Sequence, residues 1–321
     1  MTTSAKHQTK VVTLGEILVE IMRPASGQPL DRPGEFRGPF ASGAPAIFAV
    51  AAARLGLNSA FIGAVGEDAF GRMLRNTLSA EGVDLRGLQT LPDYATGAAF
   101  VSYDGTGERE FVFHIRHAAA GQIAAGAIPK QIFDGARWLH ISGSTLALNE
   151  NCRTACQLAL RLTRAAGGKI SLDPNLRPEL MPLEDFQGVI EPYLVEADLL
   201  LPTAGEARAI TGETDEYRAA QKIARKPGAI TVLKHGSAGC SIHQHREYFE
   251  VPGFPVTEID PTGAGDCFSA AFIAGLEAGL PLVQVGRYAN AAGALAVTKL
   301  GPLEGAPTQR QVEKLLDRED L

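Results

Sequence analysis

The stretch DPTGAGD (260–266) combines residue types that could hold an anion and place an acid beside it. Gly263, Ala264 and Gly265 precede Asp266, and the apolar run SAAFIAGLEAGL (269–280) predicts a helix beginning around them. The first turn of a helix offers unpaired N–H groups and a partial positive charge, which bind an anion. Asp266 either caps this helix or takes a proton from a group beside the bound anion. Small residues favour the second role, because they let the backbone approach the anion closely.

Other common catalytic motifs are absent from the sequence. It contains no G-x-x-x-x-G-K-[ST], no G-x-G-x-x-G after the first strand, no G-x-S-x-G and no H-E-x-x-H. These absences argue against P-loop enzymes, dinucleotide-binding enzymes, common serine hydrolases and zincins. His235, His243 and His245 could suggest a metal site, but HQH on a strand before a turn is more typical of a solvated surface.

Composition narrows the class of protein further. The 321 residues are 45% hydrophobic, and a net charge of −6 favours neither nucleic acid nor a membrane surface. No apolar run approaches the roughly 20 residues that span a bilayer, and the polar first ten residues do not resemble a signal peptide. Cys152, Cys156, Cys240 and Cys267 form no C-x-x-C, which favours buried free thiols and a cytoplasmic location.

The elements that must position this chemistry alternate between strands and helices. Apolar strand-like runs are expected at 11–15, 59–66, 136–143, 169–173, 197–202 and 229–236. Helical patterns are expected at 46–56, 68–82, 150–167 and 203–212, with a mostly helical remainder after one more small β segment. Such alternation predicts an α/β fold with a mainly parallel sheet covered on both faces.

Two segments interrupt the alternation. Residues 16–40 are rich in Pro and Gly, and residues 95–117 contain two β-rich runs joined by a Gly-bearing turn. We expect them to pair as a small β layer beside the main sheet, within a single domain that spans 1–321.

Six further segments, in order along the chain, accompany DPTGAGD. They are GPFASGAPAIFAVAAARLG (38–56), GAVGEDAFGRMLRNTLSAEGV (63–83), DPNLRPEL (173–180), PTAGEA (202–207), LKHGSAGC (233–240) and NAAGALAVTKLGP (290–302). With DPTGAGDCF, this set resembles the signatures of the ribokinase/PfkB family of sugar kinases over about residues 11–307. The resemblance implies a ribokinase-like fold, in which 16–40 and 95–117 form a lid, and ATP-dependent phosphorylation of a sugar hydroxyl.

The resemblance assigns roles at the nucleotide side. It implies that Asp266 is the general base and that the amides of Gly263, Ala264 and Gly265 face the transferred phosphoryl group. Glu206 would hold Mg²⁺ through water, beside Thr203 where relatives carry Asn. The remaining nucleotide-side expectations are Asn175 at the phosphates, Lys234, Gly236 and Gly239 along the nucleotide, Asn290 at the adenine, and Asp260 with Thr262 at a monovalent cation such as K⁺.

The sugar side departs from the usual pattern. Glu20 stands where relatives carry a sugar-binding Asp, and Ser42, Gly43 and Ala44 belong to the first signature, in which Ile47 replaces the usual Asn. Arg116 resembles a lid arginine of 2-keto-3-deoxygluconate kinases, although a solvated arginine fits the position equally. Arg177 could meet a substrate carboxylate or phosphate, or lie on the surface of a loop.

The expected substrate is therefore a keto-sugar or keto-sugar acid of the fructose, tagatose or 2-keto-3-deoxygluconate type. A kinase of the same fold for a nucleoside or a pyrimidine precursor, or a non-catalytic sugar sensor, remains an alternative. Edge strands in the lid invite pairing with a second copy, so a homodimer is expected.

Overall fold

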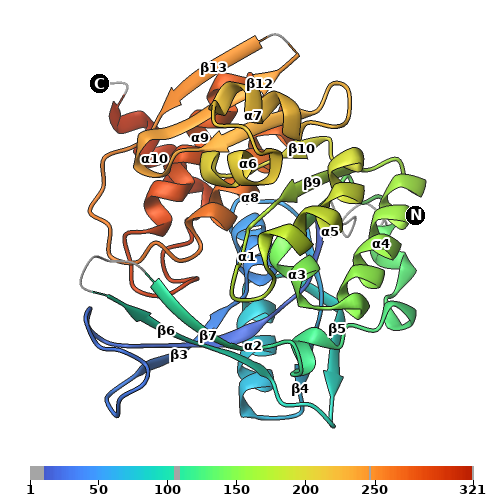
Figure 1. The fold of residues 1–321 in the computed structure, drawn as a ribbon, viewed down its shortest axis with the longest axis vertical. Coiled ribbons are helices and arrows are strands. Elements are labelled where there is room, and N and C mark those ends of the chain that lie inside the picture. Colours follow the sequence, from blue (N-terminus) through green and yellow to red (C-terminus); the bar gives the residue numbers. More distant parts are fainter. Residues whose placement is uncertain (1–10, 105–108, 246, 320–321) are drawn as a thin grey trace, which may run out of the picture.

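The computed structural model describes residues 11–104, 109–245 and 247–319 (Figure 1). In this part of the chain, a nine-stranded sheet has the strand order β13-β12-β11-β10-β9-β8-β1-β4-β5. Its strands are β1 (Val11–Leu14), β4 (Ser59–Gly66), β5 (Asp84–Leu91), β8 (Trp138–Ser142), β9 (Lys169–Asp173), β10 (Leu199–Leu200), β11 (Ile230–Lys234), β12 (Gly239–Gln244) and β13 (Glu247–Pro252). All pairs from β11 to β5 are parallel, and the β12–β13 hairpin adds two antiparallel strands at one edge.

Helices cover both faces of this sheet. They are α1 (Ala44–Arg54), α2 (Ala69–Ala80), α3 (Gly143–Leu148), α4 (Glu150–Ala165), α5 (Leu183–Glu196), α6 (Ala204–Thr211), α7 (Glu216–Ile223), α8 (Ala264–Glu277), α9 (Leu282–Ala296) and α10 (Gln309–Glu319). Short 3₁₀ turns lie at Ala119–Gly121, Ala125–Ala127, Lys130–Phe133 and Gly236–Ala238. None of the described helices is long and apolar enough to cross a membrane.

Two apolar cores follow from the alternation of side chains along buried strands. Val11 on β1 points to the core under α1, α2, α8, α9 and α10, whereas Val12 points to the core under α3 to α7. A strand that is buried on both faces has a continuous apolar sequence rather than an alternating one. The sequences of β1 and β4 have this pattern, and both strands are buried along their whole length. All four cysteines are buried free thiols.

The second sheet is small and lies across one end of the molecule (Figure 1). It has the order β3-β2-β6-β7, with β2 (Leu18–Met22), β3 (Arg37–Ser42), β6 (Gly97–Tyr103) and β7 (Arg109–His114). The pairing of β2 with β6 is parallel and joins the two segments that interrupt the alternation. The expectation of an α/β fold, with a mainly parallel sheet covered on both faces and a small β layer beside it, is confirmed.

The sequence analysis did not identify β5, α5 and α7. Helix α5 contains Gly188 and Pro192, residues that disfavour a helix in isolation. Its burial of Phe186, Ile190 and Tyr193 outweighs that preference, because most helical stability in proteins comes from packing an apolar face. Strand β10 is also shorter than its apolar run suggests.

Candidate active site

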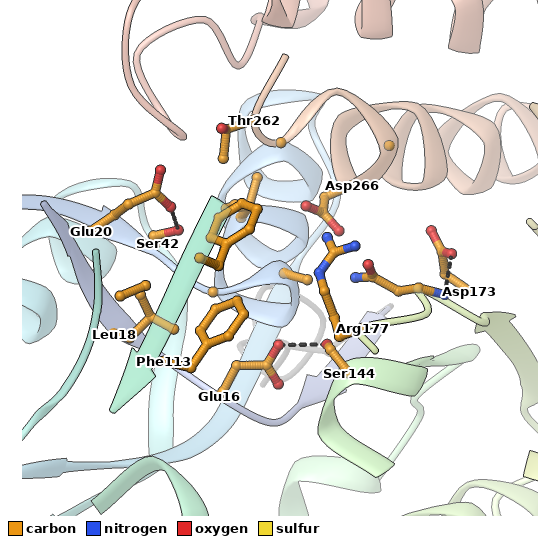
Figure 2. Close-up of a pocket in the computed structure, with 18 of the residues that line it drawn as sticks. Glu16, Leu18, Glu20, Ser42, Phe113, Ser144, Asp173, Arg177, Thr262 and Asp266 are labelled. Carbon is orange, nitrogen blue, oxygen red and sulfur yellow. Dashed lines mark hydrogen bonds between the residues drawn. The ribbon is translucent and has the colours of Figure 1, made fainter. Parts of the chain in front are cut away.

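A pocket opens where the small sheet faces the carboxyl ends of the parallel strands (Figure 2). Segments that follow β1, β8, β9 and β10, with Lys234 at the end of β11, form one wall, and the N-terminus of α8 forms another. The small sheet contributes the third wall through Leu18, Ala99, Phe111 and Phe113. The carboxyl edge of a parallel sheet is where open α/β folds place their ligands.

The turn before α8 is shaped by glycine. Gly263 has φ +82°, and a Cβ there would lie 2.6 Å from the carbonyl oxygen of Pro302. No side chain caps the start of α8. Of the amides expected to face a phosphoryl group, that of Ala264 donates a long hydrogen bond of 3.4 Å to the Pro261 carbonyl. Gly263 and Gly265 line the pocket.

Asp266 lies in the first turn of α8 and its side chain faces the pocket (Figure 2). It is 9% exposed. Burial raises its pKa well above the ordinary value, as does the nearby negative charge of Asp173, while Lys234 and Arg177 oppose the rise. A carboxylate with a raised pKa is a stronger base toward a hydroxyl proton. Asp266 therefore places a carboxyl group of raised pKa in the pocket, and no side chain caps the start of α8.

A buried ion pair lies beside the glycine turn. Lys234 Nζ is 2.6 Å from Asp173 Oδ2, and Ser269 Oγ donates to the same oxygen at 3.3 Å. Burial would lower the pKa of Lys234, but Asp173 and Glu206 outweigh it and hold the pKa above its usual value. A Cβ on Gly265 would lie 3.3 Å from Nζ. The ammonium group therefore adds positive charge next to the amides of the turn.

The loop after β9 brings two more expected residues into the pocket. Asn175 is a non-glycine residue with φ +39°, and its backbone N–H donates to Asp173 Oδ1 at 3.2 Å. Arg177 extends its guanidinium toward Asp266 (Figure 2). Asn tolerates the left-handed region better than most residues, because its short side chain can form local hydrogen bonds.

Glu206 is held by a capping box at the start of α6. Its Oε2 accepts from the Thr203 N–H at 2.7 Å and from Thr203 Oγ at 2.9 Å, and its Oε1 accepts from Leu176 N at 2.8 Å. Three protein donors already use much of the carboxylate, so it suits a Mg²⁺ ion that keeps its water shell. The residues fit outer-shell binding of Mg²⁺.

Asp260 is fully buried and joins three parts of the chain. Its Oδ1 accepts from Tyr103 Oη at 2.8 Å and from Thr262 N at 2.9 Å, and its Oδ2 accepts from Gly301 N at 2.9 Å. Thr262 is buried and lines the pocket, as does the adjacent Pro261. These contacts hold the loop before α8, and Tyr103 connects this loop to β6.

The far end of the pocket contains Glu20 and Ser42 from neighbouring strands of the small sheet (Figure 2). Ser42 Oγ donates to Glu20 Oε2 at 2.8 Å. Glu20 Oε1 is buried and has no hydrogen-bond partner among the described residues. Burial raises the pKa of Glu20 to about 7. An acceptor without a donor matches a sugar hydroxyl. Gly43 and Ala44 complete this wall.

Six expected residues lie outside the pocket lining: Ala264 and Asp260, whose contacts are given above, and Arg116, Asn290, Gly236 and Gly239. Arg116 is exposed, and its guanidinium donates to the carbonyl of Leu180. Asn290 is buried, and its amide donates to the carbonyls of Val251 at 2.9 Å and Pro252 at 3.0 Å. Gly236 and Gly239 shape the turn between β11 and β12, beyond the pocket.

Several lining residues were missed by the sequence analysis, among them Arg109, Glu16 and Ser144. Arg109 begins β7 and lines the pocket on the lid side, in contrast to Arg116. Glu16 and Ser144 lie at its floor, and their side chains are hydrogen-bonded to each other (Figure 2). An acid directly after Gly15 at the end of a buried strand was the signal for Glu16. Ser144 carried no comparable signal.

Comparison with known proteins agrees with this geometry. The model of a family described as "pfkB family carbohydrate kinase" matches residues 8–309. Fructokinase-1 from Zea mays is 33% identical over 318 residues, which cover 96% of this chain and 98% of the relative.

Solved structures are similar over the same extent. An E. coli protein in complex with ATP and Mg²⁺ has a TM-score of 0.90 and 40% identity, covering 97% of this chain and 99% of the other. A double mutant of fructokinase from Vibrio cholerae O395, bound to fructose, ADP and potassium, has a TM-score of 0.84 and 30% identity, covering 97% and 99%.

Proposed function

Since the chain belongs to the pfkB family and is an ATP-dependent carbohydrate kinase, we propose that its acceptor is a hydroxyl of a keto-sugar or keto-sugar acid and that Asp266 is the general base. The observation that carries the proposal is the position of Asp266. It is a buried carboxyl group of raised pKa that faces a pocket with an unpartnered sugar-side acceptor, Glu20 Oε1, at the other end.

The proposed reaction is an in-line displacement at the γ-phosphorus of ATP. Asp266 takes the hydroxyl proton while the sugar oxygen forms a bond to phosphorus, and the bond from phosphorus to the β,γ-bridging oxygen breaks to leave ADP. The glycine turn, the dipole of α8 and the Lys234 ammonium stabilise the negative charge of the transferring group. Bound Mg²⁺ would supply further charge neutralisation, held through water at Glu206.

The lid side supports a sugar as the acceptor. Glu20 and Ser42 offer oxygen atoms to hydroxyl groups, and the apolar faces of Phe111 and Phe113 close the pocket above them. A closed lid excludes water, which would otherwise accept the phosphoryl group. Arg177 and Arg109 are the cations that could face a carboxylate if the acceptor is a sugar acid. The fructokinase names of the compared relatives favour a keto-sugar.

The first test is ADP release with Mg-ATP and a panel of ketoses, aldoses, sugar acids and nucleosides. We expect a keto-sugar or its acid to stimulate turnover. The variant Asp266→Asn should lower kcat by roughly 10²- to 10⁴-fold, because it removes the base and leaves the shape of the pocket. Unchanged melting of the variant would serve as the folding control.

Other outcomes separate the alternatives. Turnover with a nucleoside alone would replace the proposed substrate class. A sugar that raises the melting temperature without stimulating ADP release would identify a sensor. Full activity of Asp266→Asn would refute the assignment of the base.

A further inference from the structure

A chain of buried hydroxyl groups connects Glu16 to Asn175 at the floor of the pocket. Ser144 Oγ donates to Glu16 Oε1 at 2.6 Å, Ser144 Oγ lies 2.7 Å from Ser142 Oγ, and Asn175 Nδ2 donates to Ser142 Oγ at 3.0 Å. These residues follow or end three neighbouring strands, β1, β8 and β9. Each is at most 9% exposed, so water does not compete for the hydrogen bonds.

The carboxylate of Glu16 at one end determines which group donates and which accepts in every hydrogen bond of this series. Burial raises the pKa of Glu16, while the hydrogen bonds from Ser144 and Thr145 oppose the rise. In its ionised form Glu16 only accepts hydrogen bonds, so the Ser144 hydroxyl uses its single proton in the bond to Glu16 Oε1. The bond between the two serines must then be donated by Ser142. With its proton used, the Ser142 hydroxyl can only accept from Asn175. The amide nitrogen of Asn175 therefore faces Ser142, and Asn175 Oδ1 is directed elsewhere.

This orientation matters because the backbone does not hold Asn175 in a relaxed conformation. Its φ of +39° lies in the left-handed region, which most non-glycine residues avoid, although Asn tolerates it better than most. Two glycines allow the neighbouring loops to approach closely. A Cβ on Gly143 would lie 1.9 Å from the Pro174 carbonyl oxygen, and one on Gly15 would lie 2.0 Å from Thr145 Oγ. The loop that carries Asn175 is thus fitted closely to the chain of hydroxyls.

We propose that Glu16 is a positioning residue, which orients the Asn175 side chain for phosphoryl transfer through Ser144 and Ser142. The inference rests on the proposed function of the pocket, in which Asn175 faces the phosphates. Glu16 then acts on the nucleotide end although it lies at the floor of the pocket. Its other oxygen, Oε2, accepts from Thr145 Oγ at 2.7 Å and takes no part in the chain.

The experiment uses a double-mutant cycle with Mg-ATP and the most active sugar. Both Glu16→Gln and Ser142→Ala should lower kcat at least about tenfold, weaken Mg-ATP binding at least about threefold, and leave the KM for the sugar within about twofold. Glu16→Gln removes the carboxylate that determines which groups donate hydrogen bonds. Ser142→Ala interrupts the series of hydrogen bonds to Asn175 while leaving Glu16 in place. In the Asn175→Ala background, neither change should lower kcat by more than about a further twofold.

Thr145→Val is the matched control. It also removes one buried hydrogen bond to Glu16, but it leaves the chain to Asn175 intact, so kcat should stay within about twofold even if the melting temperature falls. Equal losses of kcat in Thr145→Val and Ser142→Ala would mean a merely structural role and would overturn the proposal.

Two further outcomes would also overturn it. Effects of Glu16→Gln and Asn175→Ala that multiply in the double mutant would show that Glu16 does not act through Asn175. A higher KM for the sugar at unchanged kcat would show that Glu16 binds the sugar directly. Titration calorimetry with Mg-ATP needs no acceptor, so it tests the orientation of Asn175 even if every sugar of the panel fails.

Discussion

Carboxyl groups of the same chemistry have different roles in this pocket because their surroundings differ. Asp173 is paired with Lys234, Asp260 accepts three hydrogen bonds, and Glu16 accepts two from hydroxyl groups. Glu20 accepts one hydrogen bond from Ser42 and leaves its other oxygen unsatisfied. Desolvation disfavours the charged form, and it raises the pKa of Glu16 as well, where the hydrogen bonds from Ser144 and Thr145 oppose the rise. Glu20 is consequently a carboxyl group that changes its charge near neutral pH.

The variant Glu20→Gln tests this balance through stability. The pKa of Glu20 is about 7 in the folded protein and about 4.5 otherwise, so unfolding releases a proton between these pH values. The free energy of unfolding of the wild type should fall as pH rises from about 4.5 to about 7, with a contribution on the order of 3 kcal/mol from this group. Urea unfolding at pH 4.5 and pH 8 should show that the free energy of unfolding decreases less in Glu20→Gln than in the wild type, because the Gln side chain cannot ionise. An identical decrease in both proteins would contradict the raised pKa.

Helix α8 has a glycine at each end, and the two glycines have different surroundings. Gly263 precedes its first turn and Gly279 follows its last, and both have left-handed backbones, with φ of +82° and +73°. A Cβ on Gly263 would collide with the carbonyl oxygen of Pro302 at 2.6 Å, whereas a Cβ on Gly279 would meet nothing within 4 Å. Of these two glycines, only Gly263 combines a left-handed backbone with a close approach beside the pocket.

Alanine at these two positions separates backbone strain from the geometry of the site. Gly279→Ala should cost about 1 to 2 kcal/mol in the free energy of unfolding and leave kcat unchanged, because only the left-handed backbone is penalised. Gly263→Ala should cost more and should also lower kcat at least about tenfold, since the turn must move away from Pro302. Thermal unfolding and steady-state kinetics measure both. Equal behaviour of the two variants would mean that the turn tolerates displacement.

At the scale of the whole molecule, the small sheet has two unlike faces. Phe111 and Phe113 of β7 line the pocket, while the alternate residue Val112 is 40% exposed on the outer face. Val112 lies opposite Phe100 of β6, and Phe36 packs against Phe100 with ring centroids 5.9 Å apart. Phe36, Phe100 and Val112 form an outer lid patch, and we propose it as the place where a second copy docks.

Sedimentation analysis tests the dimer. The wild type should sediment at about twice the chain mass of 33.9 kDa, and Val112→Glu should shift it toward the monomer by placing a charge in the patch. Val283→Glu is the matched control, because Val283 on α9 is 41% exposed and lies outside the lid. A monomeric wild type, or a Val112→Glu variant that remains a dimer, would exclude the outer lid patch as the interface.

The amino-acid sequence was enough to predict the fold class, the family and a small β layer built from two distant segments. These conclusions depend on local information: apolar runs of strand length, glycine turns, and motifs such as DPTGAGD in which the relevant residues are adjacent. The position of Asp266 in the first turn of a helix belongs to the same kind of information. Its role as the base stays a prediction.

The tertiary structure alone decided which side chains from different strands meet. Glu16 and Ser144 are hydrogen-bonded although they are 128 residues apart, because β1 and β8 are neighbours in the sheet. Arg109 lines the pocket and Arg116 does not, because successive side chains point to opposite faces along β7 and Arg116 lies beyond its end. Strand order and side-chain direction are set by packing of the whole chain, so no short motif could reveal these contacts.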